Sequence, residues 1–415
     1  MNFLEELEWR GLVKDVTDRE GLVERLKTPV TLYCGFDPTA DSLHVGHLQQ
    51  LILLKRYQEQ GHHPIALIGG ATGMIGDPRP TTERKLLNDE ELAKNFKGIA
   101  SQIERVLSSD DNPIKIVDNA DWLKDITMLD FLRDYGKHFG INTMMAKETV
   151  ASRLDTGISF TEFSYIILQA IDFLHLYKEE GIELQIGGSD QWGNLVAGAD
   201  LIRKMEGNDA KVYGVTSHLI MKADGTKFGK SEGANVWLDP ARTNPYEFYQ
   251  FFFNTSDDDI IDFLKRLSLR SVDEIKALEA SFNKAPHLRE AQKALAEELT
   301  AMVFGQEGLE QALKITEALF KGTIHELSSE EIHHAFKGVE TFKVKDGNVV
   351  DVLVEAKVFN SKREARQLIQ GKGLRINGQV VESETDQLLK ENALADDISI
   401  LRRGKKTYFV LEHQG

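Results

Sequence analysis

The chain has 415 residues and a net charge of −16, so it is too long for one ordinary core and we expect two or three domains. The acidic balance argues against a protein that coats nucleic acid, because such proteins neutralise phosphates with basic surfaces. A single cysteine, Cys34, excludes an internal disulfide and a cysteine-built zinc site, and the absence of any apolar run of roughly 18 residues, with an acidic start, predicts a cytoplasmic protein without a membrane span.

Short apolar strands alternate with helical patterns up to about residue 215. The expected strands are 30–36, 64–70, 114–117 and 183–188, and the expected helices follow Gly46 and span 89–107. Largely apolar strands separated by helices indicate a buried parallel sheet. We therefore predict an α/β fold over residues 1–215, a doubly wound parallel-sheet nucleotide-binding domain with its ligands at the carboxyl ends of the strands.

The segment from Asp41 to His47 connects the first of these strands to the helix that follows it. A helix N-terminus offers unpaired N–H groups and a positive dipole end to an anion, and Gly46 has no side chain to keep a nucleotide base off the backbone. His44 and His47 flank this glycine as hydrogen-bond donors. By itself the pattern is more typical of a loop with two solvated histidines.

The helix expected over 163–174 places Tyr165, Gln169 and Asp172 at i, i+4 and i+7, so the three side chains share one face. The spacing alone favours a solvent-facing stripe on an amphipathic helix. Exposed stripes are usually richer in Lys and Glu, however, and this face mixes donors with acceptors. It therefore suits a small polar ligand.

Residues 187–194 follow the last of the expected strands. Paired glycines, Gly187 and Gly188, permit close approach of a sugar to the backbone, and Asp190 can accept hydrogen bonds from ribose hydroxyls. A structural turn with two glycines is the alternative.

A glycine-containing loop, 225–231, brings two lysines and a serine together and can close on a phosphate. By itself such a loop is most often a solvated charged turn. It falls in a segment, 216–244, that we expect to be a catalytic loop and connector. Residues 245–327 show helical periodicity without a convincing strand, which predicts a separate all-helical domain, and 328–345 is polar and mixed, which predicts a linker.

The last segment, 346–415, is a compact unit near the small end of the domain range. From Thr341 onward the chain has 13 Lys and Arg against 11 Asp and Glu, so the tail is slightly basic while the rest is strongly acidic. Ser361 is predicted to cap a short helix with Glu364 at the capping-box position. Lys362, Arg363, Arg366 and Arg375, with a second basic cluster at 402–406, favour phosphate contact over a merely solvated helix.

The two glycine segments, Asp41–His47 and Gly225–Ser231, lie about 180 residues apart and in this order. Together they resemble the HIGH and KMSKS signatures of class I aminoacyl-tRNA synthetases. With the rest of the chain, including a tail that resembles a small RNA-binding module first known from a ribosomal protein, the resemblance narrows to the bacterial-type tyrosyl-tRNA synthetases and covers residues 1–415. This family implies a nucleotide-binding domain, a helical anticodon-side domain and a small α+β RNA-binding domain.

The resemblance also implies roles for individual residues. The tyrosine ammonium is expected at Asp77, Tyr165 and Gln169, its phenolic hydroxyl at Tyr33 and Asp172, and its carboxyl region at Gln191. Catalytic roles are implied for Thr39, His44, His47, Lys227, Lys230 and Ser231, ATP contacts for Gly35, Asp37, Gly46, Gly188, Asp190 and Lys230, and tRNA contacts for Lys362, Arg363, Arg366 and Arg375. The expected partners are L-tyrosine, ATP with accompanying magnesium and no protein-only metal site, the tRNA for tyrosine, and a second copy of the chain in a homodimer.

One segment departs from the family pattern. Between Asp77 and Arg84 the chain lacks a lysine that relatives commonly carry over the pyrophosphate, and Arg79 or Arg84 is the candidate substitute. Three rival functions stay open at this point: a nucleotidylyltransferase, a synthetase relative that only binds RNA, and the tryptophanyl enzyme. The loop at 225–231 argues against the nucleotidylyltransferase. The intact site residues argue against a relative that only binds RNA, and Asp172 with Tyr33 argues against the tryptophanyl enzyme.

Overall fold

The computed structural model describes residues 1–77, 87–226, 228–231, 234–404 and 407–414. The chain forms two compact units, one of Met1–Arg242 with Phe252–Val303 and the other of Thr243–Phe251 with Phe304–Gly415. Among the described residues no helix has both the length and the apolar character needed to cross a membrane.

The first unit contains a six-stranded sheet in the order β1-β6-β5-β2-β3-β4. Its strands are β1 (Asp15–Val16), β2 (Thr31–Phe36), β3 (His63–Ile68), β4 (Lys115–Asp118), β5 (Leu184–Gly188) and β6 (Tyr213–Ser217). Every neighbouring pair is parallel except β1 with β6. The predicted α/β fold with a parallel sheet is therefore confirmed, and β6, which runs across residue 215, continues the sheet beyond the predicted end of the domain.

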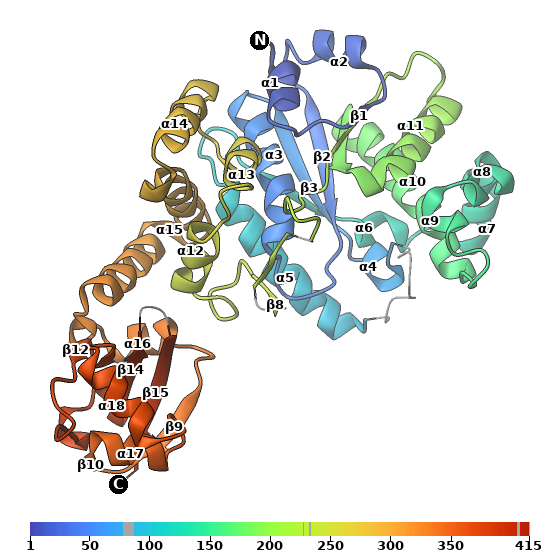
Figure 1. Ribbon diagram of the computed structural model, residues 1–415. Coiled ribbons are helices and arrows are strands. Elements are labelled where there is room, and N and C mark those ends of the chain that lie inside the picture. The colour runs from blue at the N-terminus through green and yellow to red at the C-terminus, as the bar shows by residue number, and fades with distance from the viewer. Residues whose placement is uncertain (78–86, 227, 232–233, 405–406, 415) are drawn as a thin grey trace. The chain divides into compact units, whose positions relative to one another are not determined.

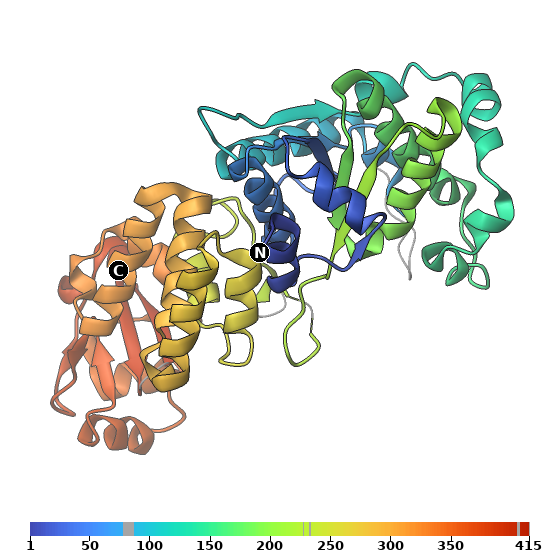
Figure 2. The same ribbon diagram turned by 90° about the horizontal axis from the view of Figure 1, so that it is seen from above.

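Helices cover both faces of this sheet. In Figure 1 the pair α3 (Leu48–Glu59) and α5 (Asp89–Val106) lies on one side of β2 and β3, and the pair α10 (Phe160–Glu180) and α11 (Trp192–Glu206) lies on the other; Figure 2 gives the same arrangement from above. Fully buried side chains such as Phe173 in α10 fill the space between helix and sheet, each contributing about 1.5–3 kcal/mol.

Local capping fixes the helices that carry the site. Helix α10 begins after Ser159, whose hydroxyl accepts from the N–H of Glu162, and ends at Gly181 with φ +63°, a conformation that glycine adopts without strain. The predicted segment 163–174 is thus the middle of a longer helix. Helix α5 begins after Asn88 with a capping box to Glu91, as the predicted helix 89–107 required.

Smaller helices complete this unit. They are α1 (Phe3–Trp9), α2 (Arg19–Arg25), η1 (Val45–His47), α4 (Thr72–Ile75), α6 (Ala120–Leu123), α7 (Met128–Asp130), η2 (Phe131–Tyr135), η3 (Gly136–His138), α8 (Ile141–Met145), α9 (Glu148–Ala151), η4 (Ser189–Gln191), α13 (Ile260–Leu267), α14 (Val272–Lys284) and η5 (Pro286–Leu288). A two-stranded ladder pairs β7 (Lys230–Ser231) with β8 (Ala234–Asn235).

The helices expected as one domain over 245–327 are divided between the two units. Helix α15 (Glu290–Lys321) is kinked at Gly305, where φ is +75°, and the boundary between the units falls beside this kink. Helix α12 (Pro245–Phe253) is divided in the same way. The compact units therefore divide at other residues than 245 and 327, and a helical anticodon-side domain between these two residues stays a prediction.

The second unit contains a five-stranded sheet in the order β12-β11-β14-β15-β9, in which only β15 and β9 are parallel. Its elements are η6 (Ile324–Glu326), α16 (Ser329–Ala335), β9 (Thr341–Val344), β10 (Gly347–Asn348), α17 (Val349–Glu355), α18 (Lys362–Gln370), β11 (Leu374–Ile376), β12 (Gln379–Val380), β13 (Gln387–Leu388), η7 (Lys390–Asn392), η8 (Ala395–Asp397), β14 (Ile398–Arg403) and β15 (Thr407–His413). This is a small α+β fold, as predicted for the tail.

The segment 328–345, expected to be a polar linker, is folded. Ser328 caps α16 with a capping box to Glu331, and Ile332 and Phe336 are buried in the second unit's core. Strand β9 then joins the sheet beside β15. The expectation of an open linker was wrong because two apolar residues on a capped helix suffice to bury a segment whose average composition is polar.

Candidate active site

A cavity of about 390 Å³ lies at the carboxyl ends of β2 and β5, the position at which open parallel sheets bind ligands. The residues that we predicted from the sequence and that line it are Tyr33, Gly35, Asp37, Thr39, His44, Gly46, His47, Asp77, Tyr165, Gln169, Asp172, Gly188, Asp190 and Gln191. The structure therefore gathers the predicted tyrosine residues and every predicted ATP residue except Lys230 into one place. Tyr165, Gln169 and Asp172 share the cavity-facing side of α10, not a solvent-facing stripe.

One end of the cavity is lined by the buried hydroxyl of Tyr33 and the buried carboxyl group of Asp172. Asp172 is 2% exposed, and its oxygens accept hydrogen bonds from the side-chain amide of Asn119 (3.0 Å) and the indole N–H of Trp122 (2.8 Å). The hydroxyl of Tyr33 is buried and has no hydrogen-bond partner among the described residues. Tyr33 lines the cavity, so its hydroxyl is available to a polar group of a bound ligand.

Burial raises the pKa of Asp172 to about 8, against the opposing effect of the hydrogen bonds from Asn119 and Trp122. Burial also raises the pKa of Tyr33 well above its ordinary value, with a smaller contribution from the charge of Asp172. At neutral pH these shifts favour a protonated carboxyl group at Asp172 and a neutral phenol at Tyr33. Both groups can donate to or accept from a hydroxyl.

Farther along the cavity a second carboxyl group, Asp77, is held by amides. It accepts hydrogen bonds from Gln191 (2.8 Å) and Asn194 (3.3 Å), and the Asn194 amide also donates to Gln169 (3.0 Å). Burial raises the pKa of Asp77 to about 6, and the nearby charge of Asp37 adds to the rise. An ammonium group placed here would lower the pKa of Asp77 and favour the ionised carboxylate further.

Asp37, which follows β2, is linked by hydrogen bonds to Asn119 at the carboxyl end of β4. It accepts from the hydroxyls of Tyr165 (3.1 Å) and Thr72 (3.1 Å), and Thr72 in turn accepts from the amide of Asn119 (2.9 Å). A continuous hydrogen-bonded network thus runs from Asp37 to Asp172. Such a network fixes each side chain through its neighbours.

The turn from His44 to His47 defines the tautomers of both imidazoles. Nδ1 of His44 accepts from the N–H of Gly46 (3.0 Å), and Nδ1 of His47 accepts from the N–H of His44 (3.2 Å). The proton of each neutral ring must then be on Nε2. A Cβ at residue 46 would lie 2.7 Å from the His44 ring, so glycine is required here by the imidazole as well as by any ligand.

Both histidines are neutral at pH 7. Burial lowers the pKa of His47 to about 3, with a further contribution from His44, and burial lowers the pKa of His44 as well. Hydrogen bonds from neutral Nε2–H groups, rather than positive charge, are what this turn can offer a phosphate. The lysines of the 225–231 loop remain the expected source of charge.

The backbone after the second glycine segment packs on this turn. Val236 donates to the carbonyl of Gly229 (3.0 Å) and accepts from the N–H of Val45 (2.9 Å). Gly229 has φ +102°, and a Cβ there would lie 3.2 Å from Val45 and 3.5 Å from the nitrogen of Gly46. Glycine is therefore needed for the two signature segments to touch.

Several predicted residues cannot be placed in detail. Lys227, Arg79 and Arg84 lie outside the described residues. Lys230 and Ser231 form the backbone of β7, and their side chains are likewise outside the description. Their roles stay predictions.

The predicted tRNA-binding residues are in the second unit. Ser361 caps α18 as predicted, whereas the Glu364 side chain accepts from the N–H of Asn360 (3.1 Å) and not from that of Ser361. Lys362 is paired with Asp351 (2.7 Å). The remaining contacts pair Arg366 with Glu384 (3.0 Å) and Arg403 with Glu364 (2.7 Å), and Arg375 donates to the carbonyl of Gly378 (3.1 Å).

The residues that orient the predicted ones were not predicted from the sequence. These are Thr72, Asn119, Trp122 and Asn194. Gln49, Gln50 and Gln185, which were not predicted either, also line the cavity. Two signals were available. Asn119 directly follows strand β4, so it lies at the carboxyl edge of the sheet, and Asn194 is one helical turn after Gln191.

Two family models match the chain. The model "tRNA synthetases class I (W and Y)" matches residues 25–321, and "Tyrosine--tRNA ligase SYY-like C-terminal domain" matches residues 331–411. The chain is 51% identical to the tyrosine-tRNA ligase of Geobacillus stearothermophilus over 419 residues and 49% identical to tyrosine-tRNA ligase 1 of Bacillus subtilis over 420 residues, each alignment covering 100% of both chains.

Solved structures agree on the fold. A C-terminally truncated mitochondrial tyrosyl-tRNA synthetase of Coccidioides posadasii is similar with a TM-score of 0.66 and 31% identity, covering 76% of this chain and 91% of that one. A tryptophan-bound tryptophanyl-tRNA synthetase of Encephalitozoon cuniculi has a TM-score of 0.56 at 16% identity, over 74% of this chain and 87% of that one. The latter shows the common fold alone.

Proposed function

The chain belongs to the class I tRNA synthetases of the tryptophan and tyrosine group and joins tyrosine to tRNA; we propose that the cavity at the ends of β2 and β5 performs the chemistry. An oxygen of the tyrosine carboxylate attacks the α-phosphorus of ATP, and pyrophosphate leaves with the electrons of the broken P–O bond. A hydroxyl of the terminal tRNA ribose then attacks the tyrosyl carbonyl carbon, and AMP leaves.

The observation that carries the tyrosine assignment is the partnerless hydroxyl of Tyr33 beside the protonated Asp172. A substrate phenol placed between them gives Tyr33 its missing partner and uses the free capacity of the Asp172 carboxyl group. Phenylalanine brings no polar atom and leaves Tyr33 unpaired. Tryptophan carries only a donor in its ring and is also larger. The pocket therefore favours a phenol.

The tyrosine ammonium fits the amide-held carboxyl group of Asp77, with Tyr165 and Gln169 beside it. Asp37 lies near Asp77 and also lines the cavity, so a cation is favoured beside these two carboxyl groups. A positive charge near Asp77 lowers the pKa of that group from about 6. Substrate binding and ionisation of the site then support each other.

ATP fits the opposite end, at the turn from His44 to His47. The neutral Nε2–H groups of His44 and His47 would donate to the phosphates, with Thr39 exposed nearby, and Gly46 would leave room for the nucleotide. Asp190 and Gly188 at the end of β5 would meet the ribose. Little covalent work is needed from the protein, because phosphoryl transfer of this kind depends on positioning and on charge stabilisation.

Lys227 and Lys230 would supply positive charge to the departing pyrophosphate. ATP would bring magnesium, which neutralises phosphate charge when bound. Among the described residues no group of three or more His, Cys, Asp or Glu is arranged to hold a metal.

The second unit would hold the tRNA through its cations in α18, β11 and β14, and the reaction would take place in the cytoplasm. A homodimer is supported by an apolar surface. Seven large apolar side chains between residues 128 and 160 are exposed on the described chain, and these are Met128, Leu129, Leu132, Ile141, Met145, Leu154 and Phe160. We assign these exposed apolar side chains, which gather on one stretch of the chain, to the contact with a second copy.

The dimer proposal is tested by Leu129→Asp, with Leu288→Asp as the control because Leu288 is also exposed but lies in η5. Sedimentation should show monomers for the first variant and dimers for the second. Dimers for both variants would place the interface elsewhere.

The tyrosine assignment is tested by amino-acid-dependent exchange of pyrophosphate into ATP. Exchange should proceed with tyrosine and should be far slower with phenylalanine or tryptophan at equal concentration. Exchange that is equal with tryptophan would show that Tyr33 and Asp172 do not select the phenol.

A further inference from the structure

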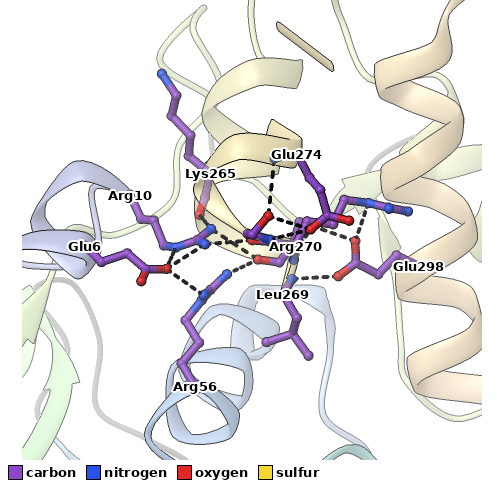
Figure 3. Close-up of polar contacts among 10 residues, drawn as sticks. Glu6, Arg10, Arg56, Lys265, Leu269, Arg270, Glu274 and Glu298 are labelled. Carbon is purple, nitrogen blue, oxygen red and sulfur yellow. Dashed lines mark hydrogen bonds and ion pairs between the residues drawn. The ribbon is translucent and has the colours of Figure 1, made fainter. Parts of the chain in front are cut away.

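Two buried arginines lie away from the cavity and take part in none of the contacts described so far. Arg10 follows α1 and is 1% exposed, and Arg56 is in α3 and is 5% exposed. Figure 3 shows Arg10 and Arg56 approaching the segment from Lys265 to Arg270 from different sides. Both come from segments far in sequence from that one.

The guanidinium groups hold the carboxyl end of helix α13. Arg10 donates to the carbonyls of Lys265 (3.2 Å) and Arg270 (2.7 Å), and Arg56 donates to the carbonyl of Ser268. The last carbonyls of a helix have no partner within the helix and carry the negative end of its dipole. Two cations at this place therefore satisfy the helix end both by hydrogen bonding and by charge.

One carboxylate lies within ion-pair distance of both buried cations. Glu6 pairs with Arg10 (2.7 Å) and Arg56 (3.5 Å), and the charges of Glu59 and Glu298 also act on Arg56. Burial lowers the pKa of Arg56 to about 10, which still leaves it charged at neutral pH. Separating α13 from α3 would take the carbonyl partners away from two buried guanidinium groups, and this makes the position of α13 relative to α3 costly to change.

A carboxylate fixes the same segment from the far side. Glu298 in α15 accepts from the hydroxyl of Ser268 (2.6 Å) and the N–H of Leu269 (2.6 Å), and it pairs with Arg270 (3.2 Å). Ser271 then begins α14 with a capping box to Glu274. The segment between α13 and α14 is thus held from both sides.

Each of the two helices joined by this clamp carries one signature segment at its other end. Helix α3 begins directly after His47, and Arg56 lies about 13 Å further along the helix axis. Helix α13 begins after Asp259, whose carboxylate accepts from the N–H of Ala223 (2.6 Å). Phe263 in α13 packs edge-on against Phe228 of the second signature, with ring centroids 4.9 Å apart.

We propose that Arg10 and Arg56 are positioning residues for adenylate formation, because they lock α13 to α3 and so set the Gly225–Ser231 loop against the His44–His47 turn. The proposal rests on the function proposed above. The close packing of Gly229 on Val45 and Gly46 is the contact that this clamp maintains. Misplacement of a reacting group by about 1 Å can cost on the order of a hundredfold in rate.

The test compares two measurements on the full chain, the single-turnover rate of tyrosyl-adenylate formation per active site and the equilibrium affinity for tyrosine without ATP. Arg56→Met should lower the rate at least about tenfold and leave the tyrosine affinity within about twofold, since the tyrosine end of the cavity does not depend on the loop. Arg56→Lys, which keeps the charge but loses the planar fork, should lie between Arg56→Met and wild type.

The matched control is Arg25→Met. Arg25 also forms a bidentate pair, with Glu183 (2.6 and 2.5 Å), but at the amino end of β5, away from the cavity. It should lose stability without a change in adenylate rate. Glu298→Gln keeps an acceptor for Ser268 and should give a slower rate than wild type with normal tyrosine affinity, so the test survives if Arg56→Met fails to fold.

A normal adenylate rate in the Arg56 and Glu298 variants would overturn the proposal. So would a loss of tyrosine affinity parallel to the loss of rate, or an equal loss of rate in Arg25→Met, because each would indicate general damage to the fold. If the wild type formed no adenylate with tyrosine, the proposed function would fail instead.

Discussion

The cavity and the C-terminal unit carry their charges in opposite ways. In the cavity Asp172 is 2% exposed and is held by two buried donors. In the C-terminal unit Lys362 is 55% exposed and is paired with a half-exposed carboxylate of its own surface. Buried groups cannot adjust to a wrong ligand, whereas surface pairs exchange partners at little cost. The first region can therefore select one amino acid, and the second can hold a long polyanion.

The largest expected effect on activity is that of a substitution at the buried Asp172. In Asp172→Asn one of the buried donors, Asn119 or Trp122, would face an amide N–H in place of an oxygen, which costs about 1–3 kcal/mol in addition to the lost contact with the phenol. We expect kcat/KM for tyrosine in pyrophosphate exchange to fall on the order of a hundredfold. Asp121→Asn, at an exposed aspartate nearby, is the control and should change little. Full activity of the Asp172→Asn variant would remove Asp172 from the site.

The same residue predicts a pH dependence of stability. The pKa of Asp172 is about 8 in the folded protein and about 4 when unfolded, so between these values the folded state binds one more proton. The wild type should then lose free energy of unfolding relative to Asp172→Asn as the pH rises from 4 to 8, by at most ~1.4 kcal/mol per pH unit. Above pH 8 the difference should be constant. Urea unfolding of both proteins across this range measures it, and a difference independent of pH would contradict the raised pKa.

Tyr33→Phe is expected to change the stability of the protein without ligands. Tyr33→Phe removes a buried hydroxyl that has no partner among the described residues, so the free protein should become more stable by about 1 kcal/mol. Thermal unfolding without ligands measures this effect. With saturating tyrosine the gain should shrink, because the wild-type hydroxyl then has a partner. A destabilised variant would mean that the hydroxyl is already satisfied.

Removing the acidic partners of the surface cations should have the smallest effect, and it should strengthen binding rather than weaken it. Asp351→Asn and Glu384→Gln free Lys362 and Arg366 from their ion pairs, so we expect tRNA to bind a few times more tightly at low salt. The adenylate rate should not change. Filter binding across a salt series measures the affinity, and weaker binding by both variants would show that these cations do not meet the tRNA.

Features that depend on residues close together in the sequence could be predicted, and features that depend on distant residues could not. Apolar runs located β2 to β5, and helical spacing placed Tyr165, Gln169 and Asp172 on one face, because both signals are local. Ser361 was identified as a cap for the same reason. Strand β1 was missed because it has only two residues. Strand β6 was missed because Gly214, Thr216 and Ser217 interrupt its apolar residues.

The supporting residues could not be predicted because their partners are far away in the chain. Asn119 and Trp122 meet Asp172 across about 50 residues, and Arg56 meets Ser268 across 212 residues. No periodicity connects such pairs. The tail cations looked free in the sequence, and only the fold shows that Lys362, Arg366 and Arg403 face carboxylates.

The central claim is that the buried end of the cavity recognises a phenol through Tyr33 and Asp172. Calorimetric titration of the wild type and Tyr33→Phe with L-tyrosine and L-phenylalanine, without ATP, tests it most directly. The wild type should bind tyrosine much more tightly than phenylalanine, and Tyr33→Phe should narrow the gap by about 1 kcal/mol, or roughly fivefold, mainly through weaker tyrosine binding. An unchanged preference in Tyr33→Phe would contradict the account.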